Sequence, residues 1–256
     1  MILDIVQIIV NYSILKNQIV CLQINSYTYN NLYVYSLENI PNIDQKIIEK
    51  KMFCRLHNLN CFNNNKINNV DHLVNTLEIL NCGGDCGIDQ THISKLKNIK
   101  ELHCSDNNKI NNVNHLANTL EILSCESSTP LNLLAKILFD SVIRYASGDH
   151  LLLSSKIPNE PFYGTSRIDQ EGISRLKHIK KLYCRNNKNI NNVNHLKQTL
   201  KVLDCSLNCG IGQEGISQLL YIKKLNCIGN KKINDASHLK QTLDVSNCEI
   251  DTTNIP

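Results

Sequence analysis

The sequence predicts an α/β solenoid, a curved parallel sheet of about eight short strands with short helical or 3-10 segments on its convex side. The first observation is a phrase of the form L-x-x-L-x-C, whose closing cysteine falls at positions 61, 82, 104, 125, 184, 205, 227 and 248. The second is its spacing, which runs 21, 22 and 21 residues from Cys61 through Cys82 and Cys104 to Cys125. Such a period indicates stacked coils, because one coil cannot bury its own apolar edge.

The copy from Ile99 to Leu116 shows how one coil is expected to fold. Alternate side chains of an extended strand face the same side, so Leu102 and Cys104 are predicted to face the core while their neighbours face solvent. Asn107 follows at a turn, where its amide can bond backbone groups that the strand leaves unpaired. Three apolar residues are then expected to close the core side of the coil: Ile110, Val113 and Leu116.

The two spacings predict two kinds of connection between strands. The 22-residue spacing carries an Ile-Asp-Gln phrase, and the Asp of this phrase, at Asp89 and Asp169, stands where a helix N-cap is useful. A short helix is therefore expected there. The 21-residue spacing carries an Ile-Asn-Asn-Val phrase that is too rich in asparagine for much α-helix, so it is expected to form 3-10 or irregular structure.

The repeat also predicts the division of the chain. Residues 51–256 are expected to form the solenoid, interrupted at 126–167 by an insertion with an apolar helix-like run and three of the five prolines. This insertion either adds a protruding element to a binding surface or is neutral. Residues 1–50 are expected to form a small N-terminal helical domain, and residues 36–55 read as a degenerate first half-coil.

The cysteines and histidines favour a structural role over chemistry. Eight of the twelve cysteines occupy one repeated apolar position, which indicates reduced, buried thiols of a cytoplasmic protein. Cys82 with Cys86, and Cys205 with Cys209, have spacings that invite a zinc site, but the repeated core position is the better explanation. The histidines of recurrent x-His-Leu phrases, at positions 72, 115, 195 and 238, are expected to be structural residues that bond a neighbouring coil. No catalytic residue, metal or cofactor is expected, and the chain is not expected to be an enzyme.

What remains is a surface for partners. The net charge of +4 is spread without a basic stripe, which argues against nucleic acid, and no apolar run reaches the roughly 20 residues of a membrane span. Residues that flank the core positions of each strand are expected to line the concave face and to bind a target protein, although a merely solvated face is the alternative. The candidate binding residues are Glu101, His103, Ser105, Lys181, Tyr183, Arg185, Asp204, Lys224 and Asn226.

The phrase L-x-x-L-x-C-x-x-N-x-x-I resembles the leucine-rich repeat, with cysteine at the third apolar strand position. The resemblance covers roughly Leu56 to Glu249. Its N-x-x-I spacing departs from the commonest N-x-L and is closer to the cysteine-containing subclass found in many F-box proteins. Ile168–Ile173 and Ile211–Ile216 also resemble the phrase that this subclass places on its convex side.

The N-terminal segment resembles an F-box in residues 4–25, although the opening Leu-Pro pair and the typical tryptophans are absent. This resemblance implies an adaptor of a cullin–RING ubiquitin ligase that docks on a Skp1-like subunit. The docking residues it implies are Ile5, Ile9, Leu15, Ile19 and Leu22. The alternative is a helical cap on a stand-alone binding module. With its abundant asparagine and its repeats, the chain resembles proteins of giant viruses that infect amoebae, or of amoebae themselves. The resemblance implies a cytoplasmic location, which is the host cytoplasm for a viral protein.

Overall fold

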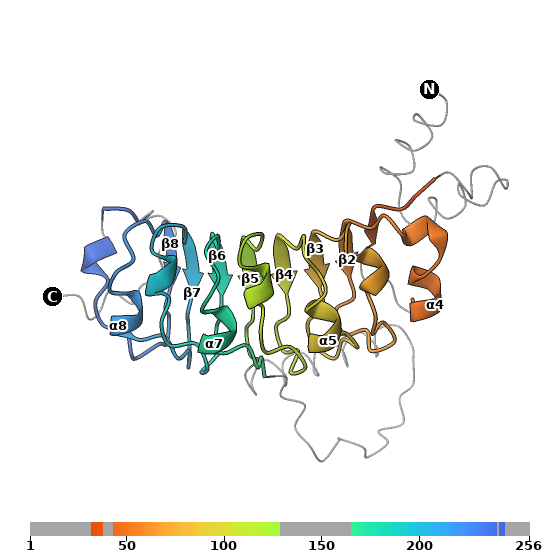
Figure 1. Ribbon diagram of the computed structural model, residues 1–256. Helices are drawn as coiled ribbons and strands as arrows, with labels where there is room; N and C mark the ends of the chain where they lie inside the picture. Colours follow the sequence, from red (N-terminus) through yellow and green to blue (C-terminus); the bar gives the residue numbers. More distant parts are fainter. Residues whose placement is uncertain (1–31, 38–42, 129–164, 240, 244–256) are drawn as a thin grey trace, which may run out of the picture.

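The computed structural model describes residues 32–37, 43–128, 165–239 and 241–243, and the structural findings below concern these residues. The F-box-like segment and the helix-like run of the insertion lie outside them. The described residues form one open sheet of parallel strands that follow one another in chain order (Figure 1). The strands are β1 (Ser36–Leu37), β2 (Asn58–Asn60), β3 (Ile79–Asn81), β4 (Glu101–His103), β5 (Ile122–Ser124), β6 (Lys181–Tyr183), β7 (Val202–Asp204) and β8 (Lys224–Asn226). An α/β solenoid-like fold is thereby confirmed.

Neighbouring strands pair at the repeat spacing, so each core position forms a column through the sheet. The strand leucines pair in register and are almost completely buried: Leu59, Leu80, Leu102, Leu123, Leu182, Leu203 and Leu225. β5 pairs directly with β6, so the sheet continues past the insertion without a break. β1, inside the range 1–50, pairs with β2 through Ser36 and Asn58 and belongs to the same sheet.

The connections alternate between two kinds, as the two spacings predict. Short α-helices are α4 (Gln45–Ile48), α5 (Gln90–Ile93), α7 (Gln170–Ile173) and α8 (Gln213–Ile216). The 3-10 helices are η1 (Lys51–Phe53), η2 (Asp71–Leu73), η3 (Asn114–Leu116), η4 (Asn194–Leu196) and η5 (Ser237–Leu239). Figure 1 shows α5, α7 and α8 standing in a row in front of the strands. Within the described ranges, no helix has the length and apolar character to span a membrane.

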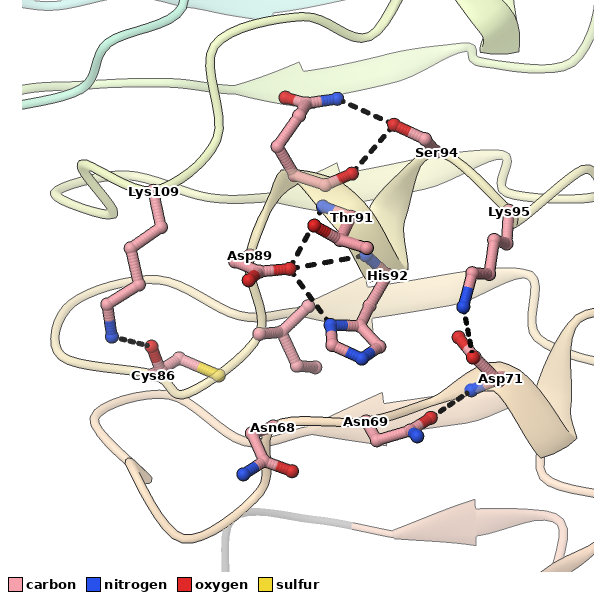
Figure 2. Close-up of polar contacts among 12 residues, drawn as sticks. Asn68, Asn69, Asp71, Cys86, Asp89, Thr91, His92, Ser94, Lys95 and Lys109 are labelled. Atoms are coloured by element: carbon pink, nitrogen blue, oxygen red, sulfur yellow. Dashed lines mark hydrogen bonds and ion pairs between the residues drawn. The ribbon is translucent and has the colours of Figure 1, made fainter.

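The predicted N-caps of the α-helices are present. Figure 2 shows the carboxylate of Asp89 accepting hydrogen bonds from the backbone N–H of Thr91, at 2.9 Å, and of His92, at 3.3 Å. Asp169 accepts from the N–H of Gly172 at 2.8 Å. These bonds satisfy N–H groups that the first turn of a helix leaves unpaired.

A glutamine at the first position of each α-helix joins neighbouring coils. Oε1 of Gln90 accepts from the N–H groups of Asn111 and Asn112, both at 3.0 Å, and its Nε2 donates to the carbonyl of Asn112 at 2.9 Å. The same three bonds recur at Gln45, Gln170 and Gln213. The backbone N–H and C=O groups of the asparagine-rich segment have no partner in a strand or helix, and the glutamine amide provides their hydrogen bonds.

The turns after β4, β6 and β8 are each held by a buried asparagine, as predicted for Asn107. Nδ2 of Asn107 donates to the carbonyls of Cys82, at 2.7 Å, and Ile88, at 3.1 Å, both in the preceding coil. Asn187 and Asn230 make the equivalent pairs of bonds in later coils. A buried carbonyl without a partner is costly, so this ladder lets each coil stack on the next.

Candidate functional site

The outward side chains of the strands form three aligned columns, which together are called the sheet face below. The strand register aligns the first column (Glu101, Ile122, Lys181, Val202, Lys224) and the second column (His103, Ser124, Tyr183, Asp204, Asn226). Backbone hydrogen bonds between the turns align the third column (Ser105, Glu126, Arg185, Ser206, Ile228). All nine candidate residues from the sequence lie on this face. Their alternation with buried Leu and Cys confirms the predicted inward and outward directions.

On β4, Glu101 and His103 point the same way and form a pair. Nε2 of His103 lies 2.7 Å from Oε1 of Glu101, and each side chain keeps about a third of its exposure, at 34% and 31%. One turn further on, Oγ of Ser105 lies 2.8 Å from Oγ of Ser124 on β5 and also accepts the N–H of Glu126. These contacts fix the side chains of β4 and β5 relative to each other.

Acidic groups gather at the centre of the sheet face. Burial raises the pKa of the Glu126 carboxyl, and the nearby carboxylates of Asp204 and Asp106 raise it further, against the opposite effect of Arg185. The pKa of Tyr183 is also raised, first by burial and then by the charges of Asp204, Glu101 and Glu126. Tyr183 is therefore a neutral phenol whose ionisation is opposed by the charges of three carboxylates, of which Asp204 is its partner in the strand register.

Asp204 on β7 is held by its neighbours. Its carboxylate accepts from the N–H of Ser206 at 3.0 Å, from Oγ of Ser206 at 2.6 Å and from Nδ2 of Asn226 at 3.0 Å. Three donors fix the direction of this carboxylate. Lys181 and Lys224, by contrast, stand exposed at the starts of β6 and β8.

One part of the centre could not be recognised from the repeat. Asp106, in the turn after β4, accepts from the N–H of Ser128 at 2.6 Å and also from its hydroxyl. Asn186 donates to the carbonyls of Ser127 and Ser128. Ser128 lies at the start of the insertion, where the repeat gives no register, so no sequence signal pairs it with Asp106.

The thiols and imidazoles make structural contacts. Among the residues that the structure describes, no group of three or more His, Cys, Asp and Glu side chains could hold a metal ion. Nε2 of His72, His195 and His238 lies 3.0–3.2 Å from the carbonyl of Ile48, Ile173 and Ile216 respectively. These rings therefore tie each 3-10 segment to the helix of a neighbouring coil, as the repeated phrase predicts.

The sheet face combines fixed acceptors, one aromatic ring, one guanidinium group and flanking lysines, which is the composition of a polar protein-binding surface. Comparison with protein-family models, with curated proteins and with solved structures finds no match to this chain.

Proposed function

We propose that this chain is a protein-binding module of the leucine-rich-repeat kind, which holds a target protein on its sheet face. The observation that supports this most strongly is the contrast between neighbouring columns. The buried column is leucine in every strand from β2 to β8, whereas the second outward column reads His103, Ser124, Tyr183, Asp204 and Asn226. A uniform core with a differing face is the arrangement expected of a surface that recognises one particular partner.

The centre of the binding surface lies at Tyr183 on β6 and Arg185 in the turn that follows this strand. Both are half-buried, and Tyr183 pairs in register with Asp204 of β7, whose carboxylate is fixed by its neighbours. Tyrosine and arginine are enriched among the residues that carry most of the binding energy of interfaces, because each combines large contact area with directed polar groups. The sheet-face residues around them would exclude water from the contact.

The finer function is that of an adaptor, in which the N-terminal segment docks on a Skp1-like subunit of a cullin–RING ligase in the host cytoplasm. Its support is the F-box resemblance of residues 4–25, which lie outside the described residues. Without that docking, the chain would act as a stand-alone binding module.

Capture of partners by the full-length chain tests the binding function. The face variant carries Tyr183→Ala and Arg185→Ala, and the control carries Lys66→Ala and Lys97→Ala, at exposed positions away from the sheet face. Quantitative mass spectrometry of cross-linked partners should show proteins that the wild type and the control retain and the face variant loses. An unchanged set of partners in the face variant would contradict the proposed surface.

A separate experiment tests the adaptor role. Full-length chain with Ile5→Asp and Ile9→Asp should lose binding to a purified Skp1-like protein, because both residues belong to the docking set that the resemblance implies. The Tyr183→Ala, Arg185→Ala variant serves as the control and should keep that binding. If the wild type never binds, the chain is a stand-alone module. If the Ile5, Ile9 variant binds as well as the wild type, the docking residues that the resemblance implies are wrong.

A further inference from the structure

A further column of side chains stands at the start of the strands, one residue before the first column of the sheet face. Each of these residues donates its backbone N–H to the carbonyl of the equivalent residue in the preceding coil, at 2.7–2.9 Å, so the column is in register. Its members from the second coil onward are Glu78, Lys100, Glu121, Lys180, Lys201 and Lys223.

The first four members of this column alternate in charge. Nζ of Lys100 lies 2.8 Å from Oε2 of Glu78, and Nζ of Lys180 lies 2.8 Å from Oε2 of Glu121. Opposite charges that face each other on neighbouring strands stabilise a sheet, whereas like charges in the same place destabilise it. This part of the column therefore neutralises itself.

The alternation stops after Lys180. Lys201 and Lys223 follow it with no acidic residue between them, and the first column of the sheet face adds Lys181 and Lys224. Lys180, Lys181, Lys201, Lys223 and Lys224 are called the lysine edge below. In the part of the chain that the structure describes, Lys181, Lys223 and Lys224 are exposed and make no ion pair. Three of the five ammonium groups of the edge are thus not paired with a carboxylate of the described chain, whereas Lys180 is paired with Glu121.

The lysine edge also carries exposed apolar surface. Nζ of Lys201 lies 4.8 Å from the ring centroid of Tyr221, which it faces in a cation–π contact. The Tyr221 side chain is 46% exposed, and its neighbour Leu220 is 54% exposed. A segment bound here would meet ammonium groups together with an aromatic ring and an aliphatic side chain, so it could bury apolar atoms as well as pair charges.

We propose that the lysine edge binds an acidic, extended segment of the target protein. This inference rests on the proposed binding of a protein by the sheet face. It adds the chemical character of the partner segment that lies over β6 to β8. Charge complementarity identifies the occupant, because ammonium groups on neighbouring strands present cations at intervals of about 4.8 Å. A carboxylate-bearing chain laid across the strand starts can reach several of them at once.

The surrounding charges favour a protein over a nucleic acid. Glu101, Glu126 and Asp204 occupy the middle of the same face, and their carboxylates would repel a phosphate backbone that continued beyond the lysine edge. The acidic stretch of a protein partner can end where these carboxylates begin. The edge also holds no arginine, the side chain that binds phosphate oxygens in pairs.

Fluorescence anisotropy with a labelled peptide of alternating Glu and Ala tests the proposal on the full-length chain. A peptide of alternating Gln and Ala is the neutral control, and a labelled single-stranded oligonucleotide is the competing polyanion. The edge variant carries Lys223→Glu and Lys224→Glu. Its matched control carries Lys66→Glu and Lys97→Glu, which change the net charge equally at other exposed positions.

The acidic peptide should bind more tightly than the neutral one, and the edge variant should lose about tenfold in affinity while the matched control loses less than about twofold. An equal loss in both variants would mean that only net charge matters, and would overturn the proposal. So would tighter binding of the oligonucleotide, or no preference for the acidic peptide. Each of these failures leaves the proposed binding function standing, because that function is judged by partners lost from Tyr183 and Arg185.

Discussion

The sulfur atoms of Cys61 and Cys86 lie 3.5 Å apart in the core, although 25 residues separate them in the chain. Cys184 and Cys209 repeat the contact at 3.7 Å, again 25 residues apart. Cys86 and Cys209 thus pack against the preceding coil. The apparent Cys-x-x-x-Cys motifs therefore combine two separate positions of the repeat, a strand cysteine and a turn cysteine.

The two thiols of each pair are predicted to react in a fixed order. The hydrogen bond to Cys86 raises the pKa of Cys61 well above its ordinary value, whereas the bond from Cys61 and the N–H groups of Ile88 and Gly87 lower the pKa of Cys86. The nearby Lys109, whose ammonium donates to the carbonyl of Cys86 at 2.8 Å (Figure 2), favours the Cys86 thiolate too. Because the thiolate is the reactive form, Cys86 should be alkylated before Cys61 during native-state labelling.

Mass spectrometry of peptides after timed iodoacetamide labelling measures this order. Cys104 is the internal control, because burial raises its pKa to about 12 and it should be among the slowest sites to react. All sites should react at similar rates after denaturation. Faster native labelling of Cys104 than of Cys86 would mean that the core is not packed as described.

Most of the structure of a coil could be predicted because the same types of residue recur at the same positions of each coil. Leu102 and Cys104 show their direction by alternation, and Asp89 shows its capping role by standing one residue before a helix. The cross-coil role of Gln90 was not predictable in the same way. Its partners, Asn111 and Asn112, lie 21 and 22 residues away, and nothing in the local phrase says which backbone groups remain unpaired.

The sheet face was predictable in its membership but not in its internal contacts. The alternation of apolar and polar residues is enough to place Glu101 and Tyr183 on the outer face. How close they lie to each other depends on the order of the strands in the sheet. The insertion hides this order, because it separates β5 from β6 in the sequence by more than one repeat, although the two strands pair directly in the sheet. The bond between Ser105 and Ser124, and the gathering of carboxylates around Tyr183, follow only from the assembled sheet.

Truncation of one core leucine should destabilise the chain locally. Leu102 is fully buried between neighbouring coils, so Leu102→Ala should cost about 2–5 kcal/mol of unfolding free energy. Hydrogen exchange should accelerate most in the coils around residues 80–125, because each coil contacts only its neighbours. Glu101→Ala, one residue away on the outer face, should change stability by about 0.5 kcal/mol or less. Equal losses from both changes would be incompatible with the inward and outward assignment.

A leucine in a left-handed turn offers a stabilising substitution. The second residue after the strand cysteine has a positive φ in most described coils, and Asn63, Asn186 and Gly229 suit that position. Leu207 adopts it with φ of 60°, which costs a residue of this kind about 1–2 kcal/mol. Leu207→Asn should therefore raise the urea midpoint of unfolding. The reverse change, Asn186→Leu, should lower it, both through backbone strain and through loss of the bonds to Ser127 and Ser128. A shift of the same sign in both variants would rule out strain at this turn.

The half-buried carboxyl of Glu126 should be a source of instability at neutral pH. Its pKa is raised above the ordinary 4.5 by burial and by Asp204, so its ionisation is less favourable in the folded chain than in the unfolded one. A group with a raised folded pKa adds stability below its unfolded pKa, and that contribution is lost as the pH rises through the folded pKa. Glu126→Gln should therefore raise the melting temperature at neutral pH, and the gain should vanish at about pH 4, where both states are protonated.

Glu121→Gln is the matched control, because it removes a carboxylate that is paired with Lys180 at 2.8 Å. That change should give no gain in stability at neutral pH, since it breaks a favourable contact instead of relieving an unfavourable one. If Glu126→Gln lowers the melting temperature at neutral pH, the carboxylate is held by favourable contacts in the free protein. The expected rise in melting temperature would instead show that the charge of Glu126 lowers the stability of the folded chain. Such a cost is typical of residues that are retained for function, here for binding a partner.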